Sequence, residues 1–366
     1  MSPTLDAPVC ARPARTAARR RAVELTGVVL LASMLAACGA THRQVAHSLQ
    51  TQAKPTSTCP ARVAPDSRPP FAPTSLWNSP VPVAASLDHQ SARLVRQLVE
   101  EVDRERARRV GPWINIYEYS VPVYRVPPCT KTVSVHLDHP DATSLQQALS
   151  AVPVPPGARP ARGGDGAMAV LQPSSDRMWE FWQMHRADGD WHASWGGAMD
   201  HVSHNPGYFH GPGPARAWGA TASGLPAMAG LITPEDLRHA SINHALAMAM
   251  PEVRATQFAA PAQRTDGRIP PPDGIPEGAH LRLDPRLNLD LMHLSPVGLA
   301  LARAAQRYGI IVVNYSTYTV FFGEDPQGRG GADPWPALLG GVSPDALLAG
   351  FPWSRLQILR MQLKSN

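Results

Sequence analysis

Several short motifs that mark common enzyme classes are missing from this chain of 366 residues. It has no Gly-x-Ser-x-Gly elbow, no phosphate-binding glycine loop and no dinucleotide-binding fingerprint. These absences argue against a serine hydrolase, a nucleotide-dependent enzyme and a nicotinamide-dependent oxidoreductase, because each of these chemistries needs its own residues at fixed spacing. The His-Glu-x-x-His pair of metalloproteases is missing too, and we find no internal repeat.

An excess of one charge is also missing, since the chain carries 34 basic and 29 acidic residues and has a net charge of +5. Residues 1–37 hold five arginines against Asp6 and Glu24, a net charge of +3. Removing them leaves the remainder at +2 (5 − 3), too little for the basic surface that nucleic-acid binding requires. We therefore expect no nucleic-acid partner. The hydrophobic fraction of 43% is ample for the core of one large domain or two ordinary ones.

The apolar run near the N-terminus, residues 25–35, is too short to cross a membrane as a stable helix. It follows the arginine-rich segment and leads through two alanines into Cys38. This arrangement resembles the lipobox of bacterial lipoproteins, in which the cysteine is lipidated and becomes the first residue of the mature protein. The sequence thus predicts a lipoprotein signal peptide over residues 1–37. An ordinary secretory signal and an uncut signal anchor are the alternatives.

Cysteine is scarce, with four residues in the whole chain. Cys10 lies in the predicted signal peptide and Cys38 would carry the lipid, which leaves Cys59 and Cys129. Because an exported chain enters an oxidising compartment, we expect these two to form a disulfide. Two unpaired thiols are the alternative.

Residues 38–70 are rich in Ala, Thr, Ser, Gln and Pro, so we expect a tether before a single folded domain over residues 71–366. Within this domain, periodicity and turn residues predict many short strands and a few helices. The strands are expected over residues 167–172, 178–185, 191–195, 242–250 and 280–283 and, as a hairpin, over 310–313 and 317–322. The helices are expected over residues 90–108, 143–152 and 296–308. This pattern favours a mainly β fold, namely a jelly-roll-like β-sandwich with several peripheral α-helices.

The tryptophan-rich middle of the chain contains a carboxylate between large apolar side chains. Read as a strand, residues 178–184 place Met178, Glu180 and Trp182 on one face. Both faces are bulky, which predicts a central strand whose carboxylate must be paired, protonated or lining a cleft. We expect Glu180 to face a cleft, where partial desolvation raises the pKa and suits a general acid. A buried ion pair with an arginine such as Arg264 is the alternative.

Flat aromatic faces with a polar edge are the surfaces on which sugar rings stack. Trp182, Trp191 and Trp195 alternate along two predicted strands, and Trp218 follows them. We expect Trp182, Trp195 and Trp218, with Arg264, to bind a substrate. The alternative is that these tryptophans fill the core of the sandwich.

The same part of the chain is rich in histidine, with His185, His192, His201, His204 and His210. Acidic or cysteine partners at a recognised spacing are missing, so we expect neither a metal ion nor another cofactor. A zinc or copper site is the alternative. His244 differs because it lies among large apolar residues, where a histidine is usually part of the core. The alternative for His244 is a general acid or base.

Several segments together resemble an uncharacterised family of exported bacterial proteins: Asp165-Gly166, Trp179-Glu180-Phe181, Gly224-Leu225-Pro226 and Ile242-Asn243-His244-Ala245-Leu246. The resemblance covers about residues 71–360 and continues at Arg264-Thr265-Asp266. Members of this family carry a histidine after the Asp-Gly pair, where this chain has Ala167. The resemblance implies export and carries no established activity. The strand-rich layout is also similar to jelly-roll sandwiches that act on polysaccharides.

These observations predict a surface-anchored, carbohydrate-active enzyme that hydrolyses a polysaccharide by carboxylate acid–base chemistry. Glu180 would be one member of the carboxylate pair and Asp165 or Asp266 the other. The first alternative is a polysaccharide lyase in the same cleft, with His244 or a tyrosine as base and Arg264 neutralising a uronate. The second is a non-catalytic glycan- or envelope-binding lipoprotein. The expected partners are a polysaccharide or cell-envelope glycan and, through the N-terminal lipid, the membrane of the bacterial envelope.

Overall fold

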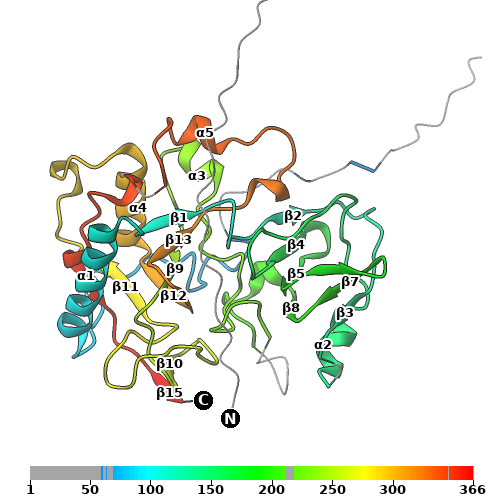
Figure 1. Cartoon of the computed structure of the whole chain (residues 1–366), viewed down its shortest axis with the longest axis horizontal. Helices are drawn as coiled ribbons and strands as arrows, with labels where there is room; N and C mark the ends of the chain where they lie inside the picture. The colour runs from blue at the N-terminus through cyan, green and yellow to red at the C-terminus, as the bar shows by residue number, and fades with distance from the viewer. Residues whose placement is uncertain are drawn as a thin grey trace, which may run out of the picture. The chain divides into compact units, whose positions relative to one another are not determined.

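The computed structural model describes residues 59–60, 63, 69–139, 141–210, 218–344 and 346–365 (Figure 1). The predicted signal peptide, the lipidation site Cys38 and most of the tether lie outside these residues. The described part consists largely of short strands in several mixed sheets, with few helices, which confirms the prediction of a mainly β fold. None of its helices combines the length and the apolar character needed to cross a membrane.

The largest sheet has six strands in the order β1-β13-β9-β12-β11-β14. Its strands are β1 (Trp113–Asn115), β9 (Leu246–Met250), β11 (His280–Leu283), β12 (Ile310–Tyr315), β13 (Val320–Phe322) and β14 (Leu356–Ile358). Strands β1 and β13 are parallel, as are β9 and β12, and the other neighbours are antiparallel. Helices α1 (Ser91–Arg108) and α4 (Pro296–Arg307) supply apolar side chains to the cluster on one face of this sheet.

Strand β9 lies between β12 and β13 and is buried along its whole length. Its large Leu and Met side chains join the cluster that contains the helices, while Ala247 faces the opposite cluster. A strand covered on both faces takes a central position with partners at both edges. The predicted hairpin between residues 310–313 and 317–322 is therefore wrong, because both strands pair with β9 and not with each other. The strand predicted over residues 242–250 begins only at Leu246.

The second sheet has four strands in the order β2-β4-β5-β8. They are β2 (Val123–Arg125), β4 (Met168–Gln172), β5 (Arg177–Trp182) and β8 (Trp195–Asp200). In β5, Met178 packs on one face and Trp179 and Phe181 pack on the other, as the period of two predicts. The alternation ends at Gln183, whose φ of 53° turns the backbone. Met184 consequently lies in the same apolar cluster as Trp179.

Residues that follow β5 leave the four-stranded sheet and enter a third one, with the order β3-β7-β6. Its strands are β3 (Val135–Leu137), β6 (His185–Ala187) and β7 (Asp190–Ala193), and helix α2 (Thr143–Ala148) packs nearby. Asp188 and Gly189, both with positive φ, form the two-residue turn between β6 and β7. The predicted meander is thus corrected: the partner of β5 is β8, and the β6–β7 hairpin lies between them in the chain. Ser194 alone separates β7 from β8.

The two larger sheets share one apolar cluster, here called the central cluster. It combines side chains of the four-stranded sheet with side chains of the six-stranded sheet, among them Ala169, Leu171, Met178, Ala247, Ile311 and Val313. Each large sheet therefore packs against the central cluster on one face. On its other face it packs against a second apolar cluster, here called its outer cluster, which contains Leu246 and Met248 for the six-stranded sheet and Trp179 and Phe181 for the four-stranded sheet. A short pair, β10 (Gln257–Ala259) with β15 (Leu363–Ser365), completes the sheets of the described residues.

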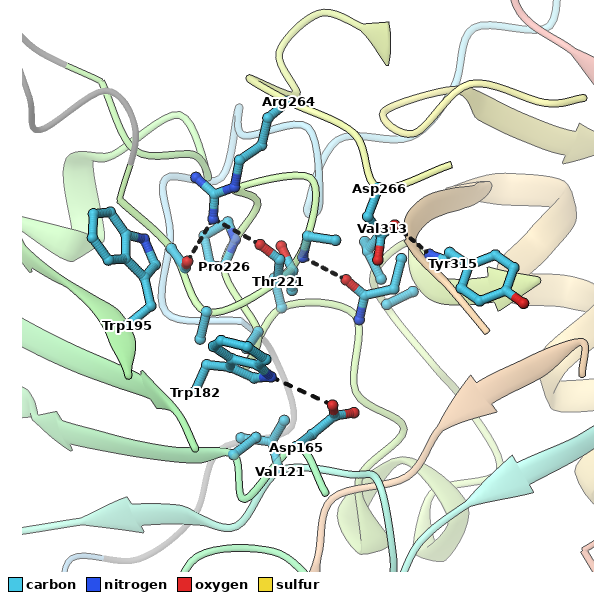
Figure 2. Close-up of a pocket in the computed structure, with 18 of the residues that line it drawn as sticks. Val121, Asp165, Trp182, Trp195, Thr221, Pro226, Arg264, Asp266, Val313 and Tyr315 are labelled. Atoms are coloured by element: carbon cyan, nitrogen blue, oxygen red, sulfur yellow. Dashed lines mark hydrogen bonds between the residues drawn. The ribbon is translucent and has the colours of Figure 1, made fainter. Parts of the chain in front are cut away.

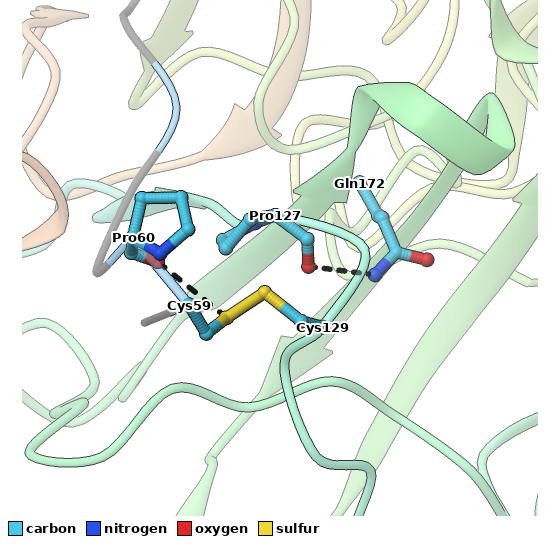
Figure 3. Close-up of a disulfide and its surroundings, with 5 residues drawn as sticks. All are labelled: Cys59, Pro60, Pro127, Cys129 and Gln172. Carbon is cyan, nitrogen blue, oxygen red and sulfur yellow. Dashed lines mark hydrogen bonds between the residues drawn. A yellow bond between two sulfur atoms is a disulfide. The ribbon is translucent and has the colours of Figure 1, made fainter. Parts of the chain in front are cut away.

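The predicted disulfide between Cys59 and Cys129 is present, with 5.8 Å between the two Cα atoms (Figure 3). It joins positions 70 residues apart and lies just beyond the end of β2. The amide of Val63 also donates to the carbonyl of Arg125 in that strand, at 3.1 Å. Together these bonds fix the end of the tether to the four-stranded sheet.

Replacing both cysteines by serine should lower the free energy of unfolding by about 4 kcal/mol, because the unfolded chain gains the freedom of a loop of this length. Urea denaturation of the oxidised wild type and of the double variant would measure the difference. A reducing agent should destabilise the wild type by a similar amount and leave the variant unchanged. Equal stability of the two oxidised proteins would contradict this prediction.

Candidate functional site

A pocket of about 730 Å³ lies between the four-stranded and the six-stranded sheets (Figure 2). Strands β5 and β8 contribute one wall, and β12 contributes part of the other. Five residues that the sequence predicted as site residues line it, namely Trp182, Trp195, Asp165, Arg264 and Asp266. Asp165 and Asp266, which are 101 positions apart in the sequence (266 − 165), thus meet in one cavity.

Trp182 and Trp195 form the aromatic part of the pocket. They are direct cross-strand partners on β5 and β8, and residues directly opposite each other project from the same face of a sheet. Both side chains are half-buried, so part of each ring remains open to the pocket. The indole Nε1 of Trp182 donates to Oδ1 of Asp165 at 3.4 Å. The pair thus presents two apolar faces beside a carboxyl group.

Asp165 precedes β4 and keeps contact with solvent in the open pocket. The pocket walls desolvate its carboxyl group, which raises the pKa of Asp165 above its ordinary value. The hydrogen bond from Trp182 opposes this rise, and the negative charge of Asp266 adds to it. Asp165 therefore retains its proton to a higher pH than an exposed aspartate does.

Asp266 lies across the pocket from Asp165 (Figure 2). Its Oδ1 accepts a hydrogen bond from the amide of Tyr315 at 3.2 Å, which fixes the carboxylate to the end of β12. Glu277 lies behind it, fully buried. Burial raises the pKa of Glu277 well above its usual range, and the nearby charge of Asp266 raises it further. The two carboxyl groups thus differ in environment, since Glu277 is sealed in the protein and Asp266 lines the pocket.

One wall of the pocket is a loop of small residues, 219–229, here called the pocket loop. Arg264 fixes the pocket loop by two hydrogen bonds. Its Nη2 donates to the carbonyl of Gly219 at 2.8 Å and to the carbonyl of Thr221 at 2.9 Å. Asn314 of β12 accepts from the amide of Ala222 at 2.7 Å. The position of this wall is therefore set by polar contacts with both sides of the pocket.

Glu180 does not face the pocket, which corrects the prediction made for it. Its side chain is fully buried (0% exposed), and its oxygens accept from the amides of Ala220 at 2.6 Å and Ala227 at 2.8 Å. Burial raises the pKa of Glu180 to about 7, although these amides and the nearby Arg264 oppose the rise. The sequence showed a carboxylate on a bulky strand but not the loop that covers it. Glu180 positions the pocket loop and has no direct access to a substrate.

No family model, curated protein or solved structure matches this chain. Function is therefore inferred from the residues of the pocket alone.

His244 lies in the core, which excludes its alternative role as an acid or base in the pocket, and Trp218 is placed differently from the prediction. His244 is fully buried; its Nδ1 lies 2.8 Å from the carbonyl of Ala245, and its Nε2 lies 3.4 Å from Oδ2 of Asp236. Asp236 belongs to the capping box of helix α3 (Pro234–Arg238), so the histidine supports that helix end. Trp218 is half-buried against the central cluster and the outer cluster of the four-stranded sheet. Neither residue lines the pocket.

Sequence reasoning missed several polar residues of the pocket. Asn314 and Tyr315, which the sequence placed in a turn, are the last residues of β12 and line the cavity. Thr221, His139 and Ser194 line it as well. The available signal was the position of Asn314 directly after four apolar residues, because polar side chains at the end of a buried strand often reach a site at the edge of a sheet.

Proposed function

We propose that the pocket binds a polysaccharide and hydrolyses its glycosidic bonds. The observation that carries this proposal is the Trp182–Trp195 pair beside Asp165, with Asp266 on the facing wall. Two aromatic faces suit the apolar side of a sugar ring, and two carboxyl groups in different environments suit acid–base cleavage. This pair replaces the one that included Glu180.

In this proposal Asp165 is the general acid, because desolvation by the pocket walls raises its pKa and so favours the protonated form that donates to the glycosidic oxygen. Asp266 is the carboxylate that either attacks the anomeric carbon or activates a water molecule. The configuration of the first sugar product, followed by NMR, distinguishes these two roles: retention indicates a covalent intermediate and inversion indicates direct attack by water.

A lyase is the second candidate, favoured by the cation of Arg264 and by Tyr315 in the same pocket. A guanidinium group would neutralise the carboxylate of a uronate, and a tyrosine is a possible base for proton removal. A third candidate is a non-catalytic glycan-binding lipoprotein that uses the tryptophan pair alone.

A screen of the purified protein on a panel of neutral and acidic polysaccharides tests the three candidates. New reducing ends without ultraviolet absorbance support hydrolysis, and absorbance from an unsaturated product supports elimination. Binding without any product would support the non-catalytic candidate and overturn the hydrolase.

We further infer that the chain belongs to the exported bacterial proteins that it resembles and is anchored to the cell envelope by a lipid on Cys38. We also infer a sandwich-like relation between the two larger sheets, supported by the central cluster they share. The two parallel strand pairs of the six-stranded sheet depart from the antiparallel pattern of a jelly roll.

Replacing Cys38 by alanine should abolish labelling with a fatty-acid probe and move the protein from the detergent phase to the aqueous phase, because a lipid chain dominates such partitioning. The Cys10→Ala variant is the matched control and should keep both properties. Membrane association of the Cys38 variant equal to that of the wild type would exclude the lipid anchor.

A further inference from the structure

Three histidines lie side by side across the three-stranded sheet. The strand registers place His136 of β3 beside His192 of β7, and His192 beside His185 of β6. The ring centroids are 5.3 Å apart in the first pair and 5.6 Å apart in the second. Cross-strand partners project from the same face, so the three imidazoles form a row on one surface of the sheet.

A carboxylate completes this row. Asp138 comes two residues after His136, and its Oδ1 lies 3.7 Å from Nδ1 of His192. Its other oxygen accepts a hydrogen bond from the hydroxyl of Ser194 at 2.8 Å. One ligand atom from each of Asp138, His185 and His192 lies within 4.8 Å of the other two. No spacing in the sequence predicts this group, because two of its members lie on β6 and β7 and the third directly follows β3.

The hydrogen bonds around the group orient its members as second-shell bonds orient metal ligands. Nδ1 of His185 lies 2.8 Å from the carbonyl of Gln183, so it carries the proton and leaves the lone pair on Nε2. Ser194 likewise fixes one carboxylate oxygen of Asp138 and leaves the other toward His192. The side chains of Asp138 and His192 are 33% and 29% exposed, so an ion can reach them from solvent.

We propose that Asp138, His185 and His192 form a binding site for a divalent transition-metal ion of the zinc class. Two imidazoles and one carboxylate suit zinc, whereas magnesium and calcium prefer oxygen ligands. Ligand atoms in a tetrahedral zinc site are roughly 3.4 Å apart, as bonds of about 2.1 Å require. Small rotations of these partly exposed side chains bring them to that spacing. Three protein ligands leave one position for water.

The ion would link all three strands of the sheet. It would also fix the segment that continues from β7 through Ser194 into Trp195, both of which line the pocket. A bound metal therefore stabilises the wall that carries one of the two tryptophans. The site itself stands on the geometry of the histidines and does not depend on the hydrolase proposal.

Titration of the metal-free protein with zinc, followed by calorimetry and by elemental analysis after dialysis, tests the site. Any affinity tag is removed beforehand. We expect one zinc ion per chain, a higher Tm with zinc, and no comparable effect of magnesium. His185→Ala and His192→Ala should each weaken binding at least about tenfold, since loss of even a second-shell partner has an effect of that size.

His204→Ala is the matched control, because His204 is an exposed histidine whose Nδ1 lies 3.9 Å from Oδ2 of Asp176 and which does not belong to the proposed ligand group. This variant should bind zinc as the wild type does. The proposal is overturned if zinc does not bind at one saturable site, or if the His185 and His192 variants bind it with wild-type affinity. Circular dichroism of both variants confirms that they remain folded.

Discussion

Replacing Asp165 with asparagine should lower kcat on the polysaccharide substrate about a thousandfold, the size expected for the loss of a general acid. Asparagine is nearly isosteric and still accepts the hydrogen bond from Trp182, but it has no acidic proton for the glycosidic oxygen. The pKa of Asp165 is raised by burial and by Asp266. Wild-type activity should accordingly fall as the pH rises through that pKa, because the deprotonated acid cannot donate.

The choice of substrate separates the role of Asp165 from that of Asp266. A glycoside with an acidic phenol as leaving group needs little protonation, so Asp165→Asn should lose much less activity on it than on the polymer. Asp266→Asn should lose activity on both, since its carboxylate acts on the sugar carbon or on water. Asp188→Asn, in the exposed β6–β7 turn, is the control and should behave as wild type. Equal losses of Asp165→Asn on both substrates would rule out the acid role.

Replacing Glu180 with glutamine should lower the free energy of unfolding by about 3 kcal/mol. The same change in a catalytic acid would mainly lower activity and leave stability nearly unchanged. The carboxyl group accepts from two backbone amides, one at each oxygen, and it keeps acceptor capacity at its hydroxyl oxygen when it is protonated. Glutamine offers one acceptor oxygen, so its NH2 group must face the other amide inside the protein. A buried donor left without an acceptor costs about 1–3 kcal/mol, and the contact between two donors adds to that. Urea denaturation measures the difference.

The pH dependence of that difference gives a second test. The pKa of Glu180 rises from 4.5 in the unfolded chain to about 7 in the folded protein. A raised folded pKa means that this contribution to stability is complete below pH 4.5 and is lost as the pH rises through about 7. The difference between wild type and Glu180→Gln should therefore be largest near pH 4 and shrink toward pH 8. Glu118→Gln, at an exposed position, should show no such trend.

The features predicted correctly from the sequence are those that depend on local periodicity or on chemistry shared by few residues. The alternation of Met178 and Trp179 followed from the period of a strand, and the pairing of Cys59 with Cys129 followed from there being two cysteines left. Asp165 and Asp266, which the sequence named as candidates for the carboxylate pair, both line the pocket.

The sequence could not predict which segment of the chain packs over each face of a strand. Glu180 was predicted to face a cleft, and an acid or base role was the alternative for His244, but a loop covers the first and a helix end covers the second. The insertion of β9 between β12 and β13 joins residues far apart in the chain, so no local pattern reports it. The same holds for the histidine row, whose members meet only through strand pairing.

The disulfide also decides where mechanical force enters the domain. A pull on the segment before Cys59 passes through the covalent bond to Cys129, beside β2 of the four-stranded sheet. The load therefore bypasses the noncovalent contacts of Val63 and Phe71, which follow Cys59 in the chain. With the bond intact, such a load is carried by strand β2 and its ladder to β4. Reduction of the bond would move the point of loading to the hydrogen bond between Val63 and Arg125 and, beyond it, to Phe71 in the central cluster.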